Sequence, residues 1–358
     1  AKYTAVNMTS SASFISLILV SSLLLASHLS LTSAQATPPL VRGLSYSFYS
    51  ANCPSLETTI RDYLREIISS DFRAAPGLLR VHFHDCFVQG CDASVLLEGS
   101  TGNPSERDAP PNLTLQARAF VLINELRNRI HRACGPIVSC ADITAIAARD
   151  AVFLSGGPDY RVPLGRRDGL NFATRDATLA NLPFFGSNAQ QLITDLAAKG
   201  MDATDLVAIS GGHTIGQSNC ASFSARLFPQ DPTMDTAFGN SLRRVCPSIT
   251  SSGITDLDVR TPRVFDNAYY VDLVNRQGLF TSDQDLFTDT TTRPIVTRFA
   301  NNQTLFFQQF VFSMIKMSML NVSTGTQGEI RTDCSRRNGA TTYLKTSVDE
   351  EEGKKAAF

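Results

Sequence analysis

The chain has 358 residues, of which 43% are hydrophobic, and its formal net charge is -1. This length and composition are enough for one large domain or two closely packed lobes. The near-neutral charge gives no indication of a surface for nucleic acid or anionic membranes, so we predict a buried small-molecule site instead.

The first 36 residues are typical of a secretory signal peptide. Residues 14–25 form a short apolar run, and an A-x-A cleavage sequence ends at Ala36. Ser21 and Ser22 interrupt the run, and no other stretch is long and apolar enough to cross a membrane. We therefore expect a secreted chain without a membrane span, ending in a polar tail over residues 343–358.

Eight cysteines follow the leader, an even number that favours four disulfides in an oxidising compartment. Many pairings are possible from the sequence alone. Cys86 and Cys91 lie close enough to bridge locally, but with His82 and His84 nearby their spacing also fits a zinc site. On this spacing the disulfide ranks ahead of the metal.

Helical periodicity dominates the chain, and alternating strand patterns are nearly absent, which predicts an all-α fold. Ser139 followed by Asp142 indicates a helix start, and Gly200 indicates a helix stop. We expect loops at residues 99–112 and 229–239. The helices that we predict lie around residues 60–68, 71–85, 120–130, 139–147, 192–196, 206–209, 267–276, 293–301 and 303–319.

Only four histidines follow the leader, namely His82, His84, His131 and His213. In the predicted helix over 71–85, Arg80 and His84 are four residues apart and share a face, while His82 points to a different side. An arginine beside a titratable base suits a reaction in which negative charge develops on oxygen. Alone, the pair also fits an ordinary helix with a packed histidine.

His213 lies in a glycine-rich segment, with Gly211 and Gly212 before it and Gly216 after it. Glycines would let a flat ligand approach the backbone, and a single imidazole there could ligate haem iron. Taken alone, such a histidine is more often a hydrogen-bonded core residue than a ligand.

Two sets of hard oxygen ligands suggest calcium. Asp85, Asp92 and Ser94 surround the tight cysteine loop, and Asp258, Thr261 and Asp266 form a second set that Thr214 joins. Similar spacings also occur in ordinary turns, so composition alone does not decide between the two interpretations.

Two long motifs tie these features together, namely LRVHFHDCFVQGCDAS at residues 79–94 and LVAISGGHTIG at residues 206–216. Through these motifs the chain closely resembles the plant secretory, or class III, haem peroxidases. The resemblance covers about residues 44–338. Shorter matches lie at residues 138–142, 162–168, 265–270 and 325–331.

The resemblance implies a two-lobed fold with haem between the lobes. The haem peroxidase domain would cover residues 37–342, with a distal lobe over roughly 43–185 and a proximal lobe over roughly 186–338. The cofactors would be haem b and two calcium ions. The enzyme would be a hydrogen-peroxide:donor oxidoreductase that reduces peroxide to water and oxidises phenolic or aromatic donors in two one-electron steps.

It also implies a role for each site residue. His213 would be the proximal iron ligand, with Asp283 accepting its other ring N–H. Arg80 would stabilise developing charge, His84 would act as acid and base, and Asn112 would fix the tautomer of His84. Two further residues complete this set: Phe83 would contact the haem and Pro183 would lie near its donor edge, although Pro183 also fits a simple turn-forming role.

The implied metal ligands and disulfides follow in the same way. Distal calcium would be held by Asp85, Val88, Gly90, Asp92 and Ser94, with Glu106 acting through water. Proximal calcium would be held by Thr214, Asp258, Thr261, Val264 and Asp266. The implied disulfides are Cys53–Cys134, Cys86–Cys91, Cys140–Cys334 and Cys220–Cys246.

Departures from the family affect the donor rather than the core chemistry. The chain has no Trp, Leu257 replaces an aromatic residue expected beside the proximal histidine, and Pro110 and Ser222 stand where some members carry phenylalanine. We therefore transfer no donor preference. Glycosylation sequons begin at Asn112, Asn302 and Asn321, of which Asn112 is unsuitable if it is buried against His84.

Three rival functions are weighed against this one. A zinc hydrolase would use His82, His84 and His213, but the first two point in different directions from a helix. A calcium-stabilised binding module would give Arg80 and His84 only structural roles. An intracellular peroxidase of the same superfamily is disfavoured by the leader and the cysteines. We expect a monomer in the extracellular space or cell wall, with the vacuole as the alternative compartment.

Overall fold

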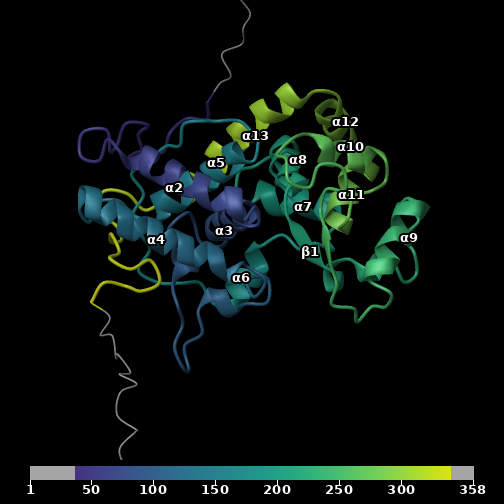
Figure 1. Cartoon of the computed structure of the whole chain (residues 1–358), viewed down its shortest axis with the longest axis horizontal. Helices are drawn as coiled ribbons and strands as arrows, with labels where there is room; N and C mark the ends of the chain where they lie inside the picture. Colours follow the sequence, from purple (N-terminus) through teal and green to yellow (C-terminus); the bar gives the residue numbers. More distant parts are fainter. Residues whose placement is uncertain (1–36, 340–358) are drawn as a thin grey trace, which may run out of the picture. The chain divides into compact units, whose positions relative to one another are not determined.

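The computed structural model describes residues 37–339, which form twelve α-helices and one small sheet (Figure 1). The predicted all-α class is confirmed. Strands β1 (Gln217–Asn219) and β2 (Ile254–Asp256) pair antiparallel, with Ser218 opposite Thr255. The helices are α2 (Leu56–Ser70), α3 (Ala74–Val88), α4 (Ala117–Cys134), α5 (Cys140–Leu154), α6 (Arg175–Asn181), α7 (Ala189–Ala197), α8 (Ala203–Ser210), α9 (Thr236–Val245), α10 (Ala268–Val274), α11 (Thr281–Thr288), α12 (Arg293–Asn301) and α13 (Gln303–Met317).

Helix α3 carries the Arg80 and His84 motif and is buried along most of its length, between α5, α4 and α2. It begins at Ala74 rather than at the predicted residue 71. The Asp71 carboxylate instead accepts the backbone N–H of Arg73, while Pro76 lies in the first turn, where its missing donor costs nothing. Burial on most sides explains why α3 lacks a simple amphipathic pattern.

Helix α5 begins where the sequence predicts. The Ser139 side chain accepts the backbone N–H of Asp142 at 3.1 Å, and this cap satisfies one donor of the first turn. The buried Asp142 carboxylate then pairs with Arg166 at 2.8 Å and accepts a hydrogen bond from Tyr49 at 2.9 Å. The buried Asp142 carboxylate is therefore paired rather than left unsatisfied.

A second group of helices positions the segment that contains His213. Helices α10 and α12 pack together, and α13 packs against α8. Asp205 in α8 accepts hydrogen bonds from Ser313 at 2.7 Å and Lys316 at 2.6 Å, both in α13. Since α8 runs directly into the turn with His213, these bonds fix the direction from which that histidine enters the site.

The predicted loop at residues 229–239 is partly wrong, because α9 begins at Thr236. The Asp235 carboxylate caps this helix by accepting the N–H of Phe238 at 2.8 Å. Phe238 and Leu242 then pack into a small core around the Cys220–Cys246 disulfide. A disulfide-anchored core of this kind is a tertiary feature that local spacing does not predict.

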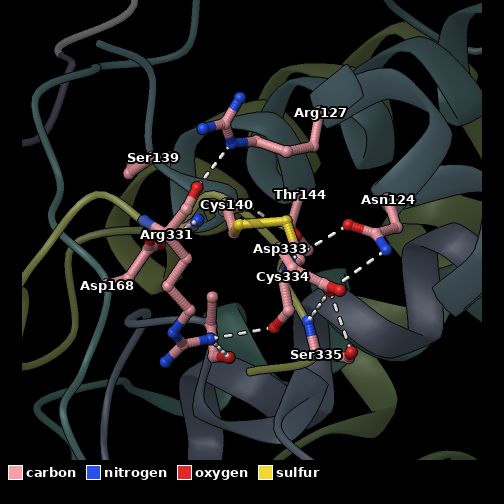
Figure 2. Close-up of a disulfide and its surroundings, with 12 residues drawn as sticks. Asn124, Arg127, Ser139, Cys140, Thr144, Asp168, Arg331, Asp333, Cys334 and Ser335 are labelled. Carbon is pink, nitrogen blue, oxygen red and sulfur yellow. Dashed lines mark hydrogen bonds between the residues drawn. A yellow bond between two sulfur atoms is a disulfide. The ribbon is translucent and has the colours of Figure 1, made fainter. Parts of the chain in front are cut away.

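All four disulfides have the pairing that the family resemblance implies, namely Cys53–Cys134, Cys86–Cys91, Cys140–Cys334 and Cys220–Cys246. Because the sulfur atoms of Cys86 and Cys91 are bonded to each other, these residues do not form a zinc site. The Cys140–Cys334 bridge joins the start of α5 to the end of the described chain (Figure 2).

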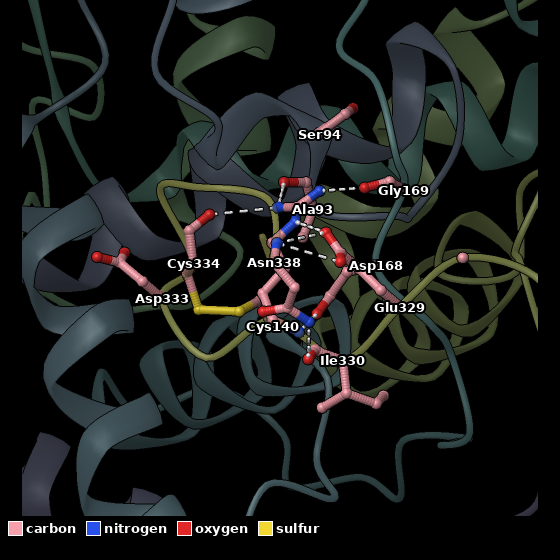
Figure 3. A network of polar contacts seen from close by, with 12 residues as sticks. Ala93, Ser94, Cys140, Asp168, Gly169, Glu329, Ile330, Asp333, Cys334 and Asn338 are labelled. Atoms are coloured by element: carbon pink, nitrogen blue, oxygen red, sulfur yellow. Dashed lines mark hydrogen bonds and ion pairs between the residues drawn. A yellow bond between two sulfur atoms is a disulfide. The ribbon is translucent and has the colours of Figure 1, made fainter. Parts of the chain in front are cut away.

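Beside this bridge, a fully buried arginine fastens the C-terminal segment (Figures 2 and 3). Arg331 donates to the carbonyl oxygens of Ala93 and Gly169, each at 2.7 Å. Its backbone N–H reaches Asp168, whose other carboxylate oxygen accepts the N–H of Ala141. The last segment of the described chain is thus tied to the loop after α3.

The two predicted lobes share one continuous hydrophobic core, which includes residues from α2 to α13. The boundary near residue 185 therefore stays a prediction. The predicted signal peptide and the tail over 343–358 lie outside the described residues. Within residues 37–339, no helix combines the length and apolarity that a bilayer crossing needs.

Candidate active site

Arg80 and His84 meet on α3 as their spacing predicts. The Arg80 Nε–H donates to His84 Nε2 at 3.2 Å. The guanidinium is held further by the carbonyl oxygens of Thr114 and Pro111, at 2.9 and 3.0 Å. These bonds hold the cation and the imidazole next to each other, one helical turn apart.

Asn112 orients the imidazole from the loop before α4. Its side-chain N–H donates to the carbonyl oxygen of Glu106 at 2.7 Å, which leaves its amide oxygen facing His84 Nδ1 at 2.6 Å. Because that oxygen can only accept, the proton of the ring lies on Nδ1 and the lone pair on Nε2. Asn112 is 4% exposed, so this sequon is closed to a glycan.

Electrostatics keep His84 neutral. Burial, reinforced by the positive charge of Arg80, lowers the pKa of His84 to about 3. Arg80 faces open space, yet desolvation by the surrounding protein lowers its pKa to about 10, which leaves it charged at neutral pH. A neutral base next to a cation suits abstraction of a proton from a ligand that then becomes anionic.

His213 lies in a 3-10 turn that continues α8. Its Nδ1–H donates to the Asp283 carboxylate of α11 at 2.7 Å. The same carboxylate accepts the backbone N–H of Phe280 at 2.9 Å, so it also caps α11. This arrangement directs the Nδ1 proton to Asp283 and leaves the Nε2 lone pair for a metal. The side chain of His213 is 39% exposed, which leaves room for a ligand.

The turn with His213 lies against the beginning of α3. A Cβ on Gly212 would contact Leu79 at 3.4 Å, and one on Gly216 would meet Pro76 at 3.2 Å. Gly216 also has φ +114°, which favours glycine. Gly211 has another role than ligand approach, because a Cβ there would collide with the packed side chains of Tyr270 and Phe306.

A cavity of about 280 Å³ lies between these two segments. Phe72, Arg73 and Pro76 line one side, and Gly216 and Gln217 line another. Sequence reasoning did not single out Arg73, whose position at the start of α3 becomes informative only once the cavity is known.

His82 points away from the pair, as predicted. Its Nδ1 is 3.6 Å from the Cys86 sulfur, and burial lowers its pKa to about 3. A zinc hydrolase using His82, His84 and His213 finds no support in the described residues, where no three His, Cys, Asp or Glu side chains converge on a metal position.

Comparison with known proteins identifies the family of the chain. Residues 60–302 match the peroxidase family. Peroxidase 12 of Arabidopsis thaliana is 58% identical over 84% of each chain, and cationic peroxidase SPC4 of Sorghum bicolor is 55% identical over 87% of each. Peroxidase C1A of Armoracia rusticana is 42% identical, over 91% of this chain and 93% of its own.

The chain belongs to the class III plant peroxidases. It is therefore a haem-dependent peroxidase, an enzyme that uses hydrogen peroxide to oxidise a donor. The rival interpretation as a binding module is wrong.

In this peroxidase, the residues predicted for the proximal calcium site lie together. The Thr214 hydroxyl is 3.0 Å from Asp258, 3.3 Å from Asp266 and 3.5 Å from the carbonyl oxygen of Val264. Thr261 joins them, with its hydroxyl 3.1 Å from Asp266. Burial raises the pKa of Asp258, and the nearby charge of Asp266 adds to this effect.

Several residues predicted for the distal site also gather after α3. Burial, followed by the charge of Asp92, raises the pKa of Asp85 well above its ordinary value, and burial raises that of Glu106 to about 7. One Asp85 oxygen accepts the N–H of Ala93, while the other is buried without a hydrogen bond. Ser94 is buried beside Asp92, whose carboxylate accepts the Ser94 N–H at 3.0 Å. Val88 ends α3, and Gly90 has φ +136°.

Phe83 and Pro183, the remaining predicted residues, each lie next to other aromatic side chains. Phe83 stacks on Phe87 with ring centroids 4.2 Å apart. Pro183 follows α6 and precedes Phe184 and Phe185, which are 58% and 40% exposed and have ring centroids 4.3 Å apart. The motifs identified in the sequence do not include this exposed aromatic pair.

Proposed function

We propose that haem b binds with His213 as its iron ligand and that Arg80 and His84 act on hydrogen peroxide. The observation that carries this proposal is the different partners of the two histidines, since both rings donate Nδ1–H and keep a lone pair on Nε2. The Nδ1–H of His213 faces the Asp283 carboxylate, whereas that of His84 faces the Asn112 amide and its Nε2 lies against Arg80. One ring is suited to metal ligation and the other to proton transfer.

The haem would lie between α3 and the turn with His213, next to the cavity beside Pro76. Arg73 and Arg263, which line that cavity together with Asp71 and Asp256, would attract the two carboxylates of haem b. Bound haem would supply the redox chemistry, taking up two oxidising equivalents from peroxide and passing them to donors one electron at a time. Phe83 would contact the haem from α3.

The residues of the chain would handle the protons and charge. His84 Nε2 would take a proton from one peroxide oxygen and return it to the other, which leaves as water. Arg80 would stabilise negative charge on that leaving oxygen. Asn112 would keep the ring proton on Nδ1, so that Nε2 stays the base throughout.

The visible absorption spectrum of the purified protein tests this proposal, before and after one equivalent of hydrogen peroxide. We expect a high-spin ferric Soret band that loses intensity and shifts. An unchanged band would rule out the roles of Arg80 and His84. Absence of a Soret band in folded protein supplied with haem would contradict haem binding.

We also propose that two calcium ions bind beside the histidines, at the Asp85 and Asp258 clusters. Raised carboxylate pKa values and the unpaired Asp85 oxygen are expected where a cation normally compensates buried charge. Because few acidic side chains converge at either cluster, carbonyl and hydroxyl oxygens would complete the coordination shell of each calcium ion. Calcium accepts such ligands readily.

Removal of calcium should lower the melting temperature. A site held at 100 times its Kd contributes about 2.7 kcal/mol, and each kcal/mol shifts the melting temperature by about 2–4 °C for domains slightly smaller than this one. Chelation followed by calorimetry measures the loss. Added calcium should restore the melting temperature better than added magnesium, and an unchanged value after verified metal removal would contradict the proposal.

Phenolic donors would dock at the exposed pair Phe184 and Phe185 beside Pro183. Replacing either ring by alanine removes an aromatic contact of about 0.5–1.5 kcal/mol, so KM for a phenolic donor should rise about two- to tenfold. Steady-state kinetics measure this, with Phe48→Ala as the control because Phe48 is also exposed, at 48%. Equal effects in all three variants would exclude a donor site here.

For localisation, we propose secretion of a monomer, with the vacuole as the alternative. Four disulfides support an oxidising compartment. Fractionation of plant tissue would separate cell wall from vacuole, and size-exclusion chromatography would reveal a larger assembly.

A further inference from the structure

The Asp283 carboxylate has a third hydrogen-bond donor besides His213 and the backbone of Phe280. The Tyr269 O–H donates to Asp283 Oδ1 at 2.9 Å. That is the same oxygen that accepts the His213 Nδ1–H at 2.7 Å, while the Phe280 N–H goes to Oδ2. Two donors therefore share the oxygen that faces the imidazole.

The position of Tyr269 is fixed by its surroundings. It lies in the first turn of α10, is 2% exposed, and contacts the edge of the His213 ring with centroids 6.0 Å apart. Since a carboxylate oxygen can only accept, the phenol is the donor in its bond to Asp283.

We propose that Tyr269 is a positioning residue that limits the electron donation of His213 to the haem iron. The inference rests on the proposed iron ligation by His213 and adds a residue that sets its strength. Tyr269 acts through Asp283 and touches neither peroxide nor donor.

The direction of the effect follows from the shared oxygen. The Tyr269 O–H stabilises negative charge on Oδ1 and makes that oxygen a weaker acceptor for the His213 proton. Without the phenol, Asp283 pulls more strongly on the Nδ1–H, and the ring becomes more imidazolate-like at Nε2. A more basic ligand favours ferric over ferrous iron.

The neighbouring tyrosine provides a matched control. Tyr270 is also fully buried in α10, but its O–H donates to the carbonyl oxygen of Val207 at 2.8 Å and not to Asp283. Tyr269→Phe and Tyr270→Phe thus each delete one buried phenolic oxygen from adjacent positions. Only the first changes the partners of the Asp283–His213 pair.

The test compares both variants with the wild type, each loaded with haem, by spectroelectrochemistry and by resonance Raman spectroscopy of the ferrous form. For Tyr269→Phe we expect the equilibrium ratio of ferric to ferrous haem at a given potential to rise about tenfold, which moves the reduction potential by about 59 mV to a more negative value. We also expect a higher iron–histidine stretching frequency. Tyr270→Phe should leave both values at wild type.

Each alternative outcome is decisive. A Soret band in all three proteins with equal potentials and stretching frequencies overturns the role of Tyr269 and leaves the proposed function intact. Equal shifts in both variants also overturn it, because they indicate a general packing effect. If folded wild type binds no haem, the inference fails together with the proposed function.

Discussion

Replacing His84 with alanine should slow the reaction with hydrogen peroxide by about 10²–10⁴-fold. We expect the upper end of this range, because the variant loses both the base that takes the peroxide proton and the acid that returns it. Stopped-flow absorption at the Soret band measures the second-order rate constant directly. Haem binding should persist, since the proposed iron ligand is His213 on another segment.

His131→Ala is the control for this variant. His131 lies in the last turn of α4, away from the hydrogen bonds that join Arg80, His84 and Asn112. Its rate constant should equal that of the wild type. A His84→Ala rate constant within threefold of wild type would show that another group, or solvent, transfers the proton.

The pH dependence of the rate constant for the reaction with hydrogen peroxide should also identify His84 as the base. His84 is active as a neutral base above its folded-state pKa, which burial lowers to about 3. The wild-type rate constant should therefore be level through neutral pH and fall only as the solution approaches that value. A fall centred near the ordinary histidine pKa of about 6.5 would show that His84 is more solvated than the structure indicates.

The sequence predicted much of this site, because its strongest signals are local. A separation of four residues on a helix placed Arg80 beside His84 and turned His82 away, and the structure agrees. The family motif extended this prediction to the Asn112 contact, which depends on a loop 28 residues away. Local spacing alone could not have found that contact.

Contacts made across the fold were harder to predict. His213 and Asp283 are 70 residues apart, and only the family motif paired them. Tyr269 belongs to a matched motif, yet its role depends on α10 and α11 packing together, which periodicity does not reveal. Helix α9 was missed for a similar reason, because its apolar face packs against a disulfide core.

The second large effect concerns the Cys140–Cys334 disulfide. This bridge joins residues separated by 194 positions, the longest separation among the bridges in the described residues. In the chain-entropy model, closing such a loop destabilises the unfolded state by about 5 kcal/mol, against about 3.5 kcal/mol for a separation near that of Cys220–Cys246. Its loss should also release Arg331, whose carbonyl partners include Cys334.

A double Cys140→Ser, Cys334→Ser variant should therefore lose more unfolding free energy than Cys220→Ser, Cys246→Ser. All four cysteines are buried, so the cost of placing serine there is similar and largely cancels in the comparison. Denaturant titration of both variants measures the difference, expected near 2 kcal/mol. If the Cys220→Ser, Cys246→Ser variant loses more unfolding free energy, the small core around α9 determines the stability of this peroxidase. The constraint on the unfolded chain would then be the smaller effect.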